Sequence, residues 1–203
     1  MTTEHFPIIR KYTPNDEVGW IRCRVLSFLD SAYYDNVYQK KEQYDGIAIE
    51  LVAEIDEQIT GLIDIECESK PSSICSRDSE YQPHLAGMLW HIAIHPDFRR
   101  LGVAKALLHE AKKHALEFGI SRLEAWTRDD DAAEQWYLSQ GFKEMQYYYH
   151  IYIEPDEMKI GGVSLDSVST IPQSLFVHYT GNDQSFLQQF KRVYKCQRFD
   201  LII

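Results

Sequence analysis

The stretch HPDFRRLGVAKALL, His95–Leu108, reads as the end of a strand, a turn and the start of a helix. Arg99 and Arg100 lie where that helix begins, although each cation beside the positive end of a helix dipole costs roughly 0.3–1 kcal/mol. A helix start also carries unsatisfied N–H groups that bind anions, and Gly102 lets a ligand approach the backbone closely. Two interpretations remain open. A bound phosphate or diphosphate attracts both arginines, or the arginines extend into solvent or pair with Asp97.

The composition limits the classes of protein to which this chain can belong. The chain has 203 residues, of which 44% are hydrophobic, and its formal net charge is -10. This is enough for one well-buried core, and the charge argues against a nucleic-acid partner because phosphate contacts need a basic face. An acidic surface can steer a cationic substrate, but it also serves solubility alone. The four cysteines form no CxxC pair, and we find neither a secretion signal nor an apolar run of about 18 residues. We therefore expect a soluble cytoplasmic protein that does not enter a membrane.

Hydrophobic periodicity predicts a single domain of mixed helices and strands over residues 1–203. A helix begins after a possible Thr13 cap, residues 31–44 form a second helix or an ordered loop, and 48–67 form a hairpin that turns near Asp56–Gln58. The helix after Arg100 ends at Gly119, and its apolar stripe consists of Leu101, Ala104, Leu107, Leu108, Ala111 and Ala115. Residues 6–10 form a short apolar run. Further strands are expected at 87–96, 122–126, 145–154, 174–181 and 194–203, further helices at 129–142 and 183–193, and polar connections at 68–85 and 155–173.

Two blocks in order, IAIHPDFRRLGVAKALL (92–108) and LEAWTRDDDAAEQWYLSQGF (123–142), resemble the GCN5-related N-acetyltransferase (GNAT) superfamily. The first block matches the family's acyl-CoA motif at Arg99, Gly102 and Ala104. The second matches at Ala133, Tyr137, Gly141 and Phe142, with Asp130 where Asn is usual. The resemblance implies an α/β (α+β) fold with a central mixed, mostly antiparallel sheet, whose parallel central strands splay apart and which helices flank. We expect residues 156–203 to form an extension that completes or covers this sheet, or a dimer contact.

The resemblance also implies a site for acetyl-CoA as co-substrate, without a metal. Backbone N–H groups of the turn would hold the pyrophosphate, and the strand before it would carry a bulge, diverge from its neighbour and bind the pantetheine arm. The N–H of Ile92 or Ala93 would polarise the thioester carbonyl. The cofactor-binding residues implied are Ile92, Ala93, Ile94, Arg99, Arg100, Leu101, Gly102, Val103, Ala104, Lys105 and Asp130. Tyr137 would protonate the departing thiolate; its alternative is a packed aromatic ring beside Trp136.

The general base does not follow from the resemblance. Family members often carry an acid at the position of Trp90 or Ala125, and neither residue here titrates. His91 and Glu124 are each one residue away, and one step along a strand turns a side chain to the other face. A bulge would bring His91 back, but a core or helix-facing histidine is the simpler reading. A water relay or Glu66 remains open, and Trp90 suggests an aromatic wall in the acceptor cleft.

The leading functional hypothesis is transfer of an acetyl group to an amine of a small molecule or peptide, in an enzyme that can form a homodimer. The alternative is a non-catalytic acyl-CoA-binding or sensor domain, since neither usual base position is acidic. A protein that binds another nucleotide is disfavoured because the chain contains neither a Walker-type loop nor a Gly-x-Gly-x-x-Gly turn. The eight histidines show no metal-ligand spacing, and a nucleophilic Cys67 or Cys75 would need a basic partner.

Overall fold

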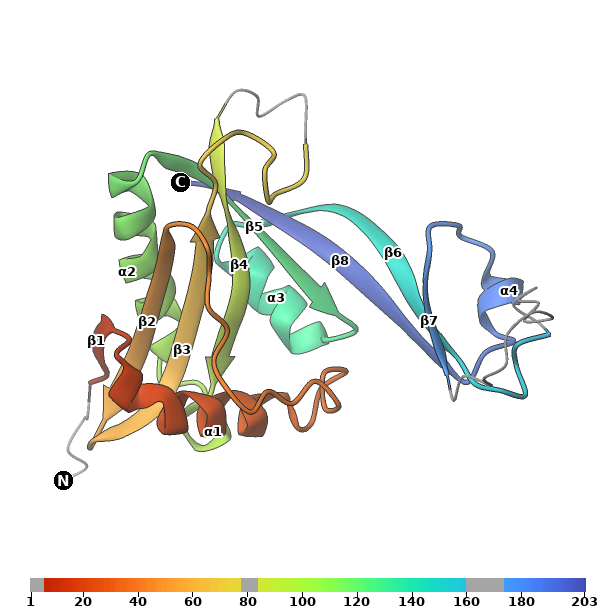
Figure 1. Ribbon diagram of the computed structural model, residues 1–203, viewed down its shortest axis with the longest axis horizontal. Coiled ribbons are helices and arrows are strands. Elements are labelled where there is room, and N and C mark those ends of the chain that lie inside the picture. The colour runs from red at the N-terminus through yellow and green to blue at the C-terminus, as the bar shows by residue number, and fades with distance from the viewer. Residues whose placement is uncertain (1–5, 78–83, 160–173) are drawn as a thin grey trace.

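The computed structural model describes residues 6–77, 84–159 and 174–203, and it has an α/β architecture in which helices flank one twisted sheet (Figure 1). The expected fold class is confirmed. The strands are β1 (Ile8–Lys11), β2 (Ala48–Ile55), β3 (Gln58–Cys67), β4 (Leu85–Ile94), β5 (Ile120–Arg128), β6 (Lys143–Ile153), β7 (Leu175–Tyr179) and β8 (Arg192–Ile202). The helices are α1 (Glu17–Phe28), α2 (Val103–Glu117), α3 (Asp131–Ser139) and α4 (Gln184–Leu187), with short 3-10 turns η1 (Pro14–Asp16) and η2 (Pro96–Phe98).

The eight strands lie in the order β1-β2-β3-β4-β5-β8-β6-β7. Every neighbouring pair is antiparallel except β4 and β5, which run parallel and are joined across the sheet by α2. A parallel pair needs such a crossover connection, whereas antiparallel neighbours can be joined by a tight turn. The hairpin of β2 and β3 turns at Asp56 and Glu57, whose φ angles of 50° and 64° suit a two-residue hairpin turn.

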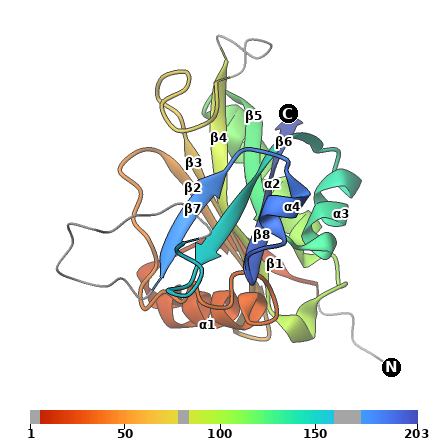
Figure 2. The ribbon, with the colours of Figure 1, turned by 90° about the vertical axis from the view of Figure 1, so that its right-hand side faces the viewer.

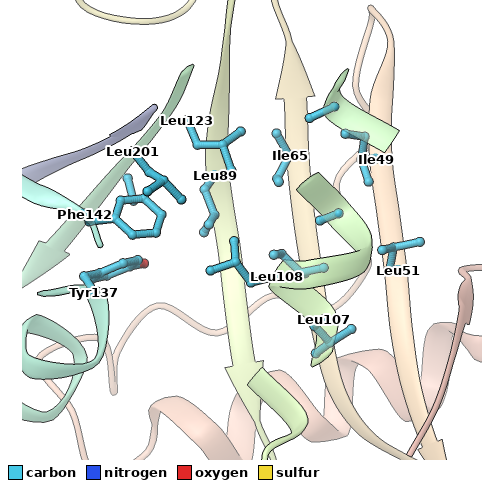
Figure 3. Packing of buried hydrophobic residues seen from close by; sticks show 14 of the residues in the cluster. Ile49, Leu51, Ile65, Leu89, Leu107, Leu108, Leu123, Tyr137, Phe142 and Leu201 are labelled. Carbon is cyan, nitrogen blue, oxygen red and sulfur yellow. The ribbon is translucent and has the colours of Figure 1, made fainter. Parts of the chain in front are cut away.

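The main core lies between α2 and one face of the sheet, and it continues to α3 (Figure 3). Leu107 and Leu108 of α2 belong to the same apolar cluster as Ile65, Leu89 and Leu123 of the sheet. The opposite face is covered by α1, which contributes Trp20 and Cys23 to a second, smaller cluster. The sheet is therefore buried on both faces at its centre. Side chains of β4 that point to α2 enter the main core, and those that point to α1 enter the smaller cluster.

The structure refines several local expectations. Leu101 does not belong to the apolar stripe of α2, because the helix begins only at Val103 and Leu101 lies before it with 58% of its surface exposed. Thr13 is the N-cap of η1, the turn that leads into α1, while Asp16 is the N-cap of α1 itself; the hydroxyl and backbone N–H of Thr13 donate to the carboxylate of Asp16 at 2.9 and 2.7 Å in a capping box. For residues 31–44, where a helix or an ordered loop was expected, the structure has the loop: turns and an irregular segment.

The C-terminal part of the chain enters the sheet out of sequence order. β8 lies between β5 and β6, so that β6 and β8 form a long two-stranded ribbon that projects from the sheet (Figure 1). β7 pairs with the outer edge of β6, and α4 lies beside it at the tip, which faces the viewer in Figure 2. The tip has its own apolar cluster, which includes Ile151, Ile153, Leu187 and Phe190. Most of the expected connection 155–173 lies outside the described residues. Within the described part of the chain, no helix is both long and apolar enough to cross a bilayer.

Candidate active site

A gap opens in the middle of the sheet between β4 and β5. The two strands pair only from Leu85 to Leu89 on β4 and from Ile120 to Ala125 on β5. β4 then continues to Ile94 while the two strands diverge (Figure 1). The far end of β4 therefore has a partner on its β3 side but none on its β5 side.

The backbone along this gap presents unpaired peptide groups. The N–H of His95 donates to the carbonyl of Thr60 in β3 at 2.9 Å. Because successive peptide groups of a strand point to opposite sides, the N–H groups of Ile92 and Ile94 point away from β3, into the gap. The N–H of Ala93 points toward β3. Of the two amides expected to polarise a carbonyl, the alternation thus directs that of Ile92 to the open edge.

A β-bulge at Trp90 changes which side chains of β4 face which helix. Asp64 pairs with His91 and the next residue, Ile65, pairs with Leu89, so that Trp90 is the extra residue. Before the bulge Leu89 faces the α2 core, and after it Ile92 does. The bulge therefore turns His91 to the α1 face.

His91 is buried on that face against the indole of Trp20, with ring centroids 5.6 Å apart. Its Nε2 lies 2.9 Å from Oε2 of Glu42. His91 therefore faces α1, as the simpler of the two interpretations predicts. Its ring is covered by α1 and by Glu42, which lies in the irregular segment after α1.

The turn between β4 and α2 forms an open cradle of backbone groups. Arg100 and Gly102 have positive φ angles of 64° and 79°, a local geometry that turns N–H groups to one side. Within the part of the chain that the structure describes, no side chain caps α2, and its first turn has no acidic residue. A Cβ built on Gly102 meets nothing within 4 Å. The cradle therefore has free donors, room at its centre and no competing negative charge, so it fits a diphosphate.

The two arginines of the turn have different environments. Both side chains are exposed, but the Nη2 of Arg99 also donates to the carbonyl of Ser27 near the end of α1 at 2.9 Å. Asp97 does not pair with either of them and lies 3.8 Å from Nδ1 of His95. Val103 is buried in the core and contributes only its backbone to the turn, while Ala104 is half-buried and Lys105 is exposed.

Tyr137 of α3 lies at the side of the gap. It is buried, stacks on Phe199 at 5.4 Å and makes an edge contact with Phe142 at 5.0 Å. Figure 3 shows its hydroxyl pointing away from α3 toward the side of the sheet where Leu89 lies. Burial raises the pKa of Tyr137 well above its ordinary value, so the phenol keeps its proton at neutral pH. Asp130 caps α3 by accepting the N–H of Ala133 at 3.0 Å.

The carboxylate of Glu124 is engaged in a buried network. Ala125 faces the α2 core, and Glu124 lies on the other face, fully buried. Glu124 accepts the backbone N–H and the hydroxyl of Ser76 at 2.8 and 2.9 Å and lies 3.2 Å from Arg122 and 3.4 Å from Arg198. These partners occupy Glu124, so it holds the loop after β3 in place. Among the described residues, no cluster of three His, Cys, Asp or Glu side chains could hold a metal ion.

One residue at the mouth of the gap, Trp126, was not among the candidate site residues predicted from the sequence, whereas Trp90 and Glu66 were. Trp126 of β5 occupies the position after the last β4–β5 pair, as Trp90 does on β4. Glu66 of β3 accepts the indole N–H of Trp90 at 2.9 Å. Alternation along 122–128 could have placed Trp126 on the same face as Glu124. The resemblance implied a bulge in β4, but its position at Trp90, which leaves His91 on the same face as Trp90, has no signal in the residues themselves.

Comparisons with known proteins agree with this geometry. A sequence profile of the acetyltransferase (GNAT) domain matches residues 45–144. Three solved structures share the fold at low sequence identity. The ribosomal-protein-S18-alanine N-acetyltransferase of Escherichia coli is 14% identical over 98% of this chain and 94% of its own, with a TM-score of 0.56. Arabidopsis thaliana NAA60, in complex with a bisubstrate analogue, is 14% identical over 98% of each chain, with a TM-score of 0.56. The PaiA N-acetyltransferase of Thermoplasma acidophilum, in complex with coenzyme A, is 16% identical over 87% of this chain and 99% of its own, with a TM-score of 0.52. The split β4–β5 pair and the open turn before α2 both lie within residues 45–144, which the family profile identifies as a GNAT acetyltransferase domain.

Proposed function

We propose that this protein is an N-acetyltransferase that uses acetyl-CoA to acetylate an amine of a small molecule or peptide. The observation that supports the proposal is that two sets of free backbone N–H groups adjoin each other. The unpaired edge of β4 at Ile92 and Ile94 leads directly into the uncapped start of α2 at Gly102. The first set suits the amide-bearing arm of the coenzyme, and the second suits its diphosphate.

Bound acetyl-CoA would supply an activated acyl group as a thioester. In this proposal the backbone of 99–105 holds the diphosphate, with Arg100 adding charge from solvent. Arg99 positions the turn through Ser27, because its guanidinium is bonded to the end of α1. Asp130 shapes the start of α3, and the N–H of Ile92 stabilises negative charge on the carbonyl oxygen as the amine attacks.

Proton transfer is assigned to Tyr137. A tyrosine phenol carries its proton at neutral pH, and the hydroxyl of Tyr137 points toward the side of the sheet where Leu89 lies, so it can donate that proton to a departing thiolate. A primary alkyl amine with a pKa near 10 is only about 0.1% neutral at pH 7, so the amine must first lose a proton. With His91 paired to Glu42 and Glu124 held by Ser76 and arginines, we assign this proton to a water relay to solvent.

One observation favours a second candidate, a non-catalytic acyl-CoA sensor. Trp90 and Ala125, where an acid is often found, cannot accept a proton, and the acid beside Ala125 is locked in an ion network. A release assay for free thiol from acetyl-CoA, run over a panel of amines and beside calorimetry of coenzyme A binding, separates the two. Amine-dependent thiol release supports the enzyme. Tight binding of coenzyme A without thiol release supports the sensor, and no binding at all contradicts both.

A further inference from the structure

Two tryptophans flank the point where β4 and β5 separate. Trp90 and Trp126 are the residues that follow the last paired positions, Leu89 and Ala125. Both lie on the face opposite α2: Trp90 bonds to Glu66 of β3, and Trp126 packs with Met88, Cys75 and Ile74 away from the α2 core. This tryptophan pair stands where an acceptor would meet the acyl group.

Each indole is oriented by a carboxylate at its N–H edge. Trp90 donates to Oε2 of Glu66 at 2.9 Å, and Trp126 donates to Oε1 of Glu124, also at 2.9 Å. The bond at the edge of Trp90 leaves the face of its ring available, and 49% of the residue is exposed. The aromatic face and the carboxylate of Glu66 are thus presented to solvent side by side.

The two carboxylates differ in how their charge is balanced. Glu124 is fully buried between Arg122 and Arg198. Glu66 is half-buried, and no cationic side chain pairs with it among residues 6–77, 84–159 and 174–203. The negative charge beside the face of Trp90 is therefore available to a ligand, in a protein whose formal net charge is -10.

The position of Glu66 in the sheet sets it apart from the reacting centre. Glu66 pairs with Met88 on β4, and β5 is the next strand across. Because neighbouring strands lie about 4.8 Å apart, Glu66 is one strand removed from the gap. A cation held there lies to the side of the gap, a position that suits a second cation of a molecule whose amine attacks across the gap.

We propose that the acceptor is a primary amine with a second positive charge a short alkyl chain away. Glu66 and the face of Trp90 bind the distal ammonium, by charge and by cation–π attraction, while the near amine lies at the gap beside Trp126. This proposal rests on the proposed acetyl transfer and names its substrate class. Glu66 is a specificity-determining residue that exchanges no proton with the reacting amine.

Three amines of equal chain length test the charge. Diaminobutane carries a distal ammonium, butylamine carries none, and γ-aminobutyrate carries a distal carboxylate. We expect kcat/KM to fall about tenfold from diaminobutane to butylamine, mainly through KM, and further for γ-aminobutyrate. Glu66→Gln should abolish the preference for diaminobutane, and Glu66→Lys should turn it toward γ-aminobutyrate. Coenzyme A affinity should be the same in all of these proteins, which shows that each is folded.

Controls isolate the site. Glu117→Gln removes the same charge from the exposed end of α2 and should leave the preference intact, whereas Trp90→Leu removes the aromatic face and should weaken binding of diaminobutane. A wild-type protein that treats diaminobutane and butylamine alike, or a preference that survives Glu66→Gln, overturns the proposal.

Calorimetry of the amines on protein saturated with coenzyme A distinguishes this failure from failure of the proposed function. Binding of diaminobutane that depends on Glu66, without turnover, supports the cation site and contradicts acetyl transfer. Turnover or binding that is independent of Glu66 contradicts the cation site alone.

Discussion

The two ends of α2 offer a matched pair of substitutions that tests the coenzyme cradle. Gly102 precedes the helix with a φ of 79°, and Gly119 follows it with a φ of 74°. A Cβ at either position meets no atom within 4 Å. Gly102→Ala and Gly119→Ala therefore place the same methyl group on similar left-handed backbone, in open space, at opposite ends of one helix.

Stability should change alike in the two variants. A left-handed alanine costs roughly 1–2 kcal/mol, and neither methyl group adds a clash, so each variant should lose about 1 kcal/mol of unfolding free energy once the stiffer unfolded chain is counted. For a domain of this size that corresponds to a fall in Tm of about 2–4 °C. Only the methyl group at position 102 stands in the cradle, where it displaces an anion from the N–H groups.

Affinity for coenzyme A should separate the variants. A hydrogen bond to a charged group contributes about 1.5–3 kcal/mol, so loss of one from the cradle raises Kd roughly tenfold to a hundredfold. Titration calorimetry with coenzyme A gives Kd, and thermal denaturation without ligand gives Tm. If Gly102→Ala binds coenzyme A as tightly as Gly119→Ala at comparable Tm, the start of α2 is not the diphosphate site.

Three further outcomes are expected. Tyr137→Phe should lower kcat by about a hundredfold or more with coenzyme A affinity within twofold of wild type, and an unchanged kcat in the thiol-release assay returns Tyr137 to a packing role. Arg100→Glu should raise the Kd for coenzyme A well over tenfold, because it sets a carboxylate against phosphates, and calorimetry that finds equal affinity contradicts the anion site. Burial, then Arg128 and His178, lower the pKa of His150 to about 4. The unfolded chain thus binds more protons than the folded one between about pH 6.5 and pH 4, and the stability contributed by neutral His150, on the order of 1–2 kcal/mol, is lost as pH falls through that window. In His150→Phe, the urea-denaturation midpoint should change less with pH over this range than it does in the wild type. An equal pH dependence of the midpoint in the two proteins refutes this assignment.

Local features of this chain were predictable because they depend on neighbours in sequence. The hairpin at Asp56–Glu57, the end of α2 at Gly119 and the acid-rich start of α3 follow from turn chemistry and helix capping. The order and spacing of the two motif blocks carried the family, and the fold class with it. Boundaries were less well determined: Leu101 shares the spacing of the apolar stripe, yet the left-handed Gly102 delays the helix until Val103.

The arrangement of the candidate site required tertiary structure. In a regular strand, His91 and Trp90 would lie on opposite faces. Because Trp90 is an extra residue without a partner on β3, both side chains lie on the face opposite α2. The hydrogen bond between Arg99 and Ser27 connects residues 72 positions apart in the sequence, and that between Trp90 and Glu66 connects residues 24 positions apart. Likewise β8 lies between β5 and β6 although it follows both in sequence. Sequence alone determined which elements form and which family they indicate, since those depend on short-range sterics and periodicity. Only the tertiary structure decided which side chains meet at the gap, because strand pairing and a single bulge set that geometry.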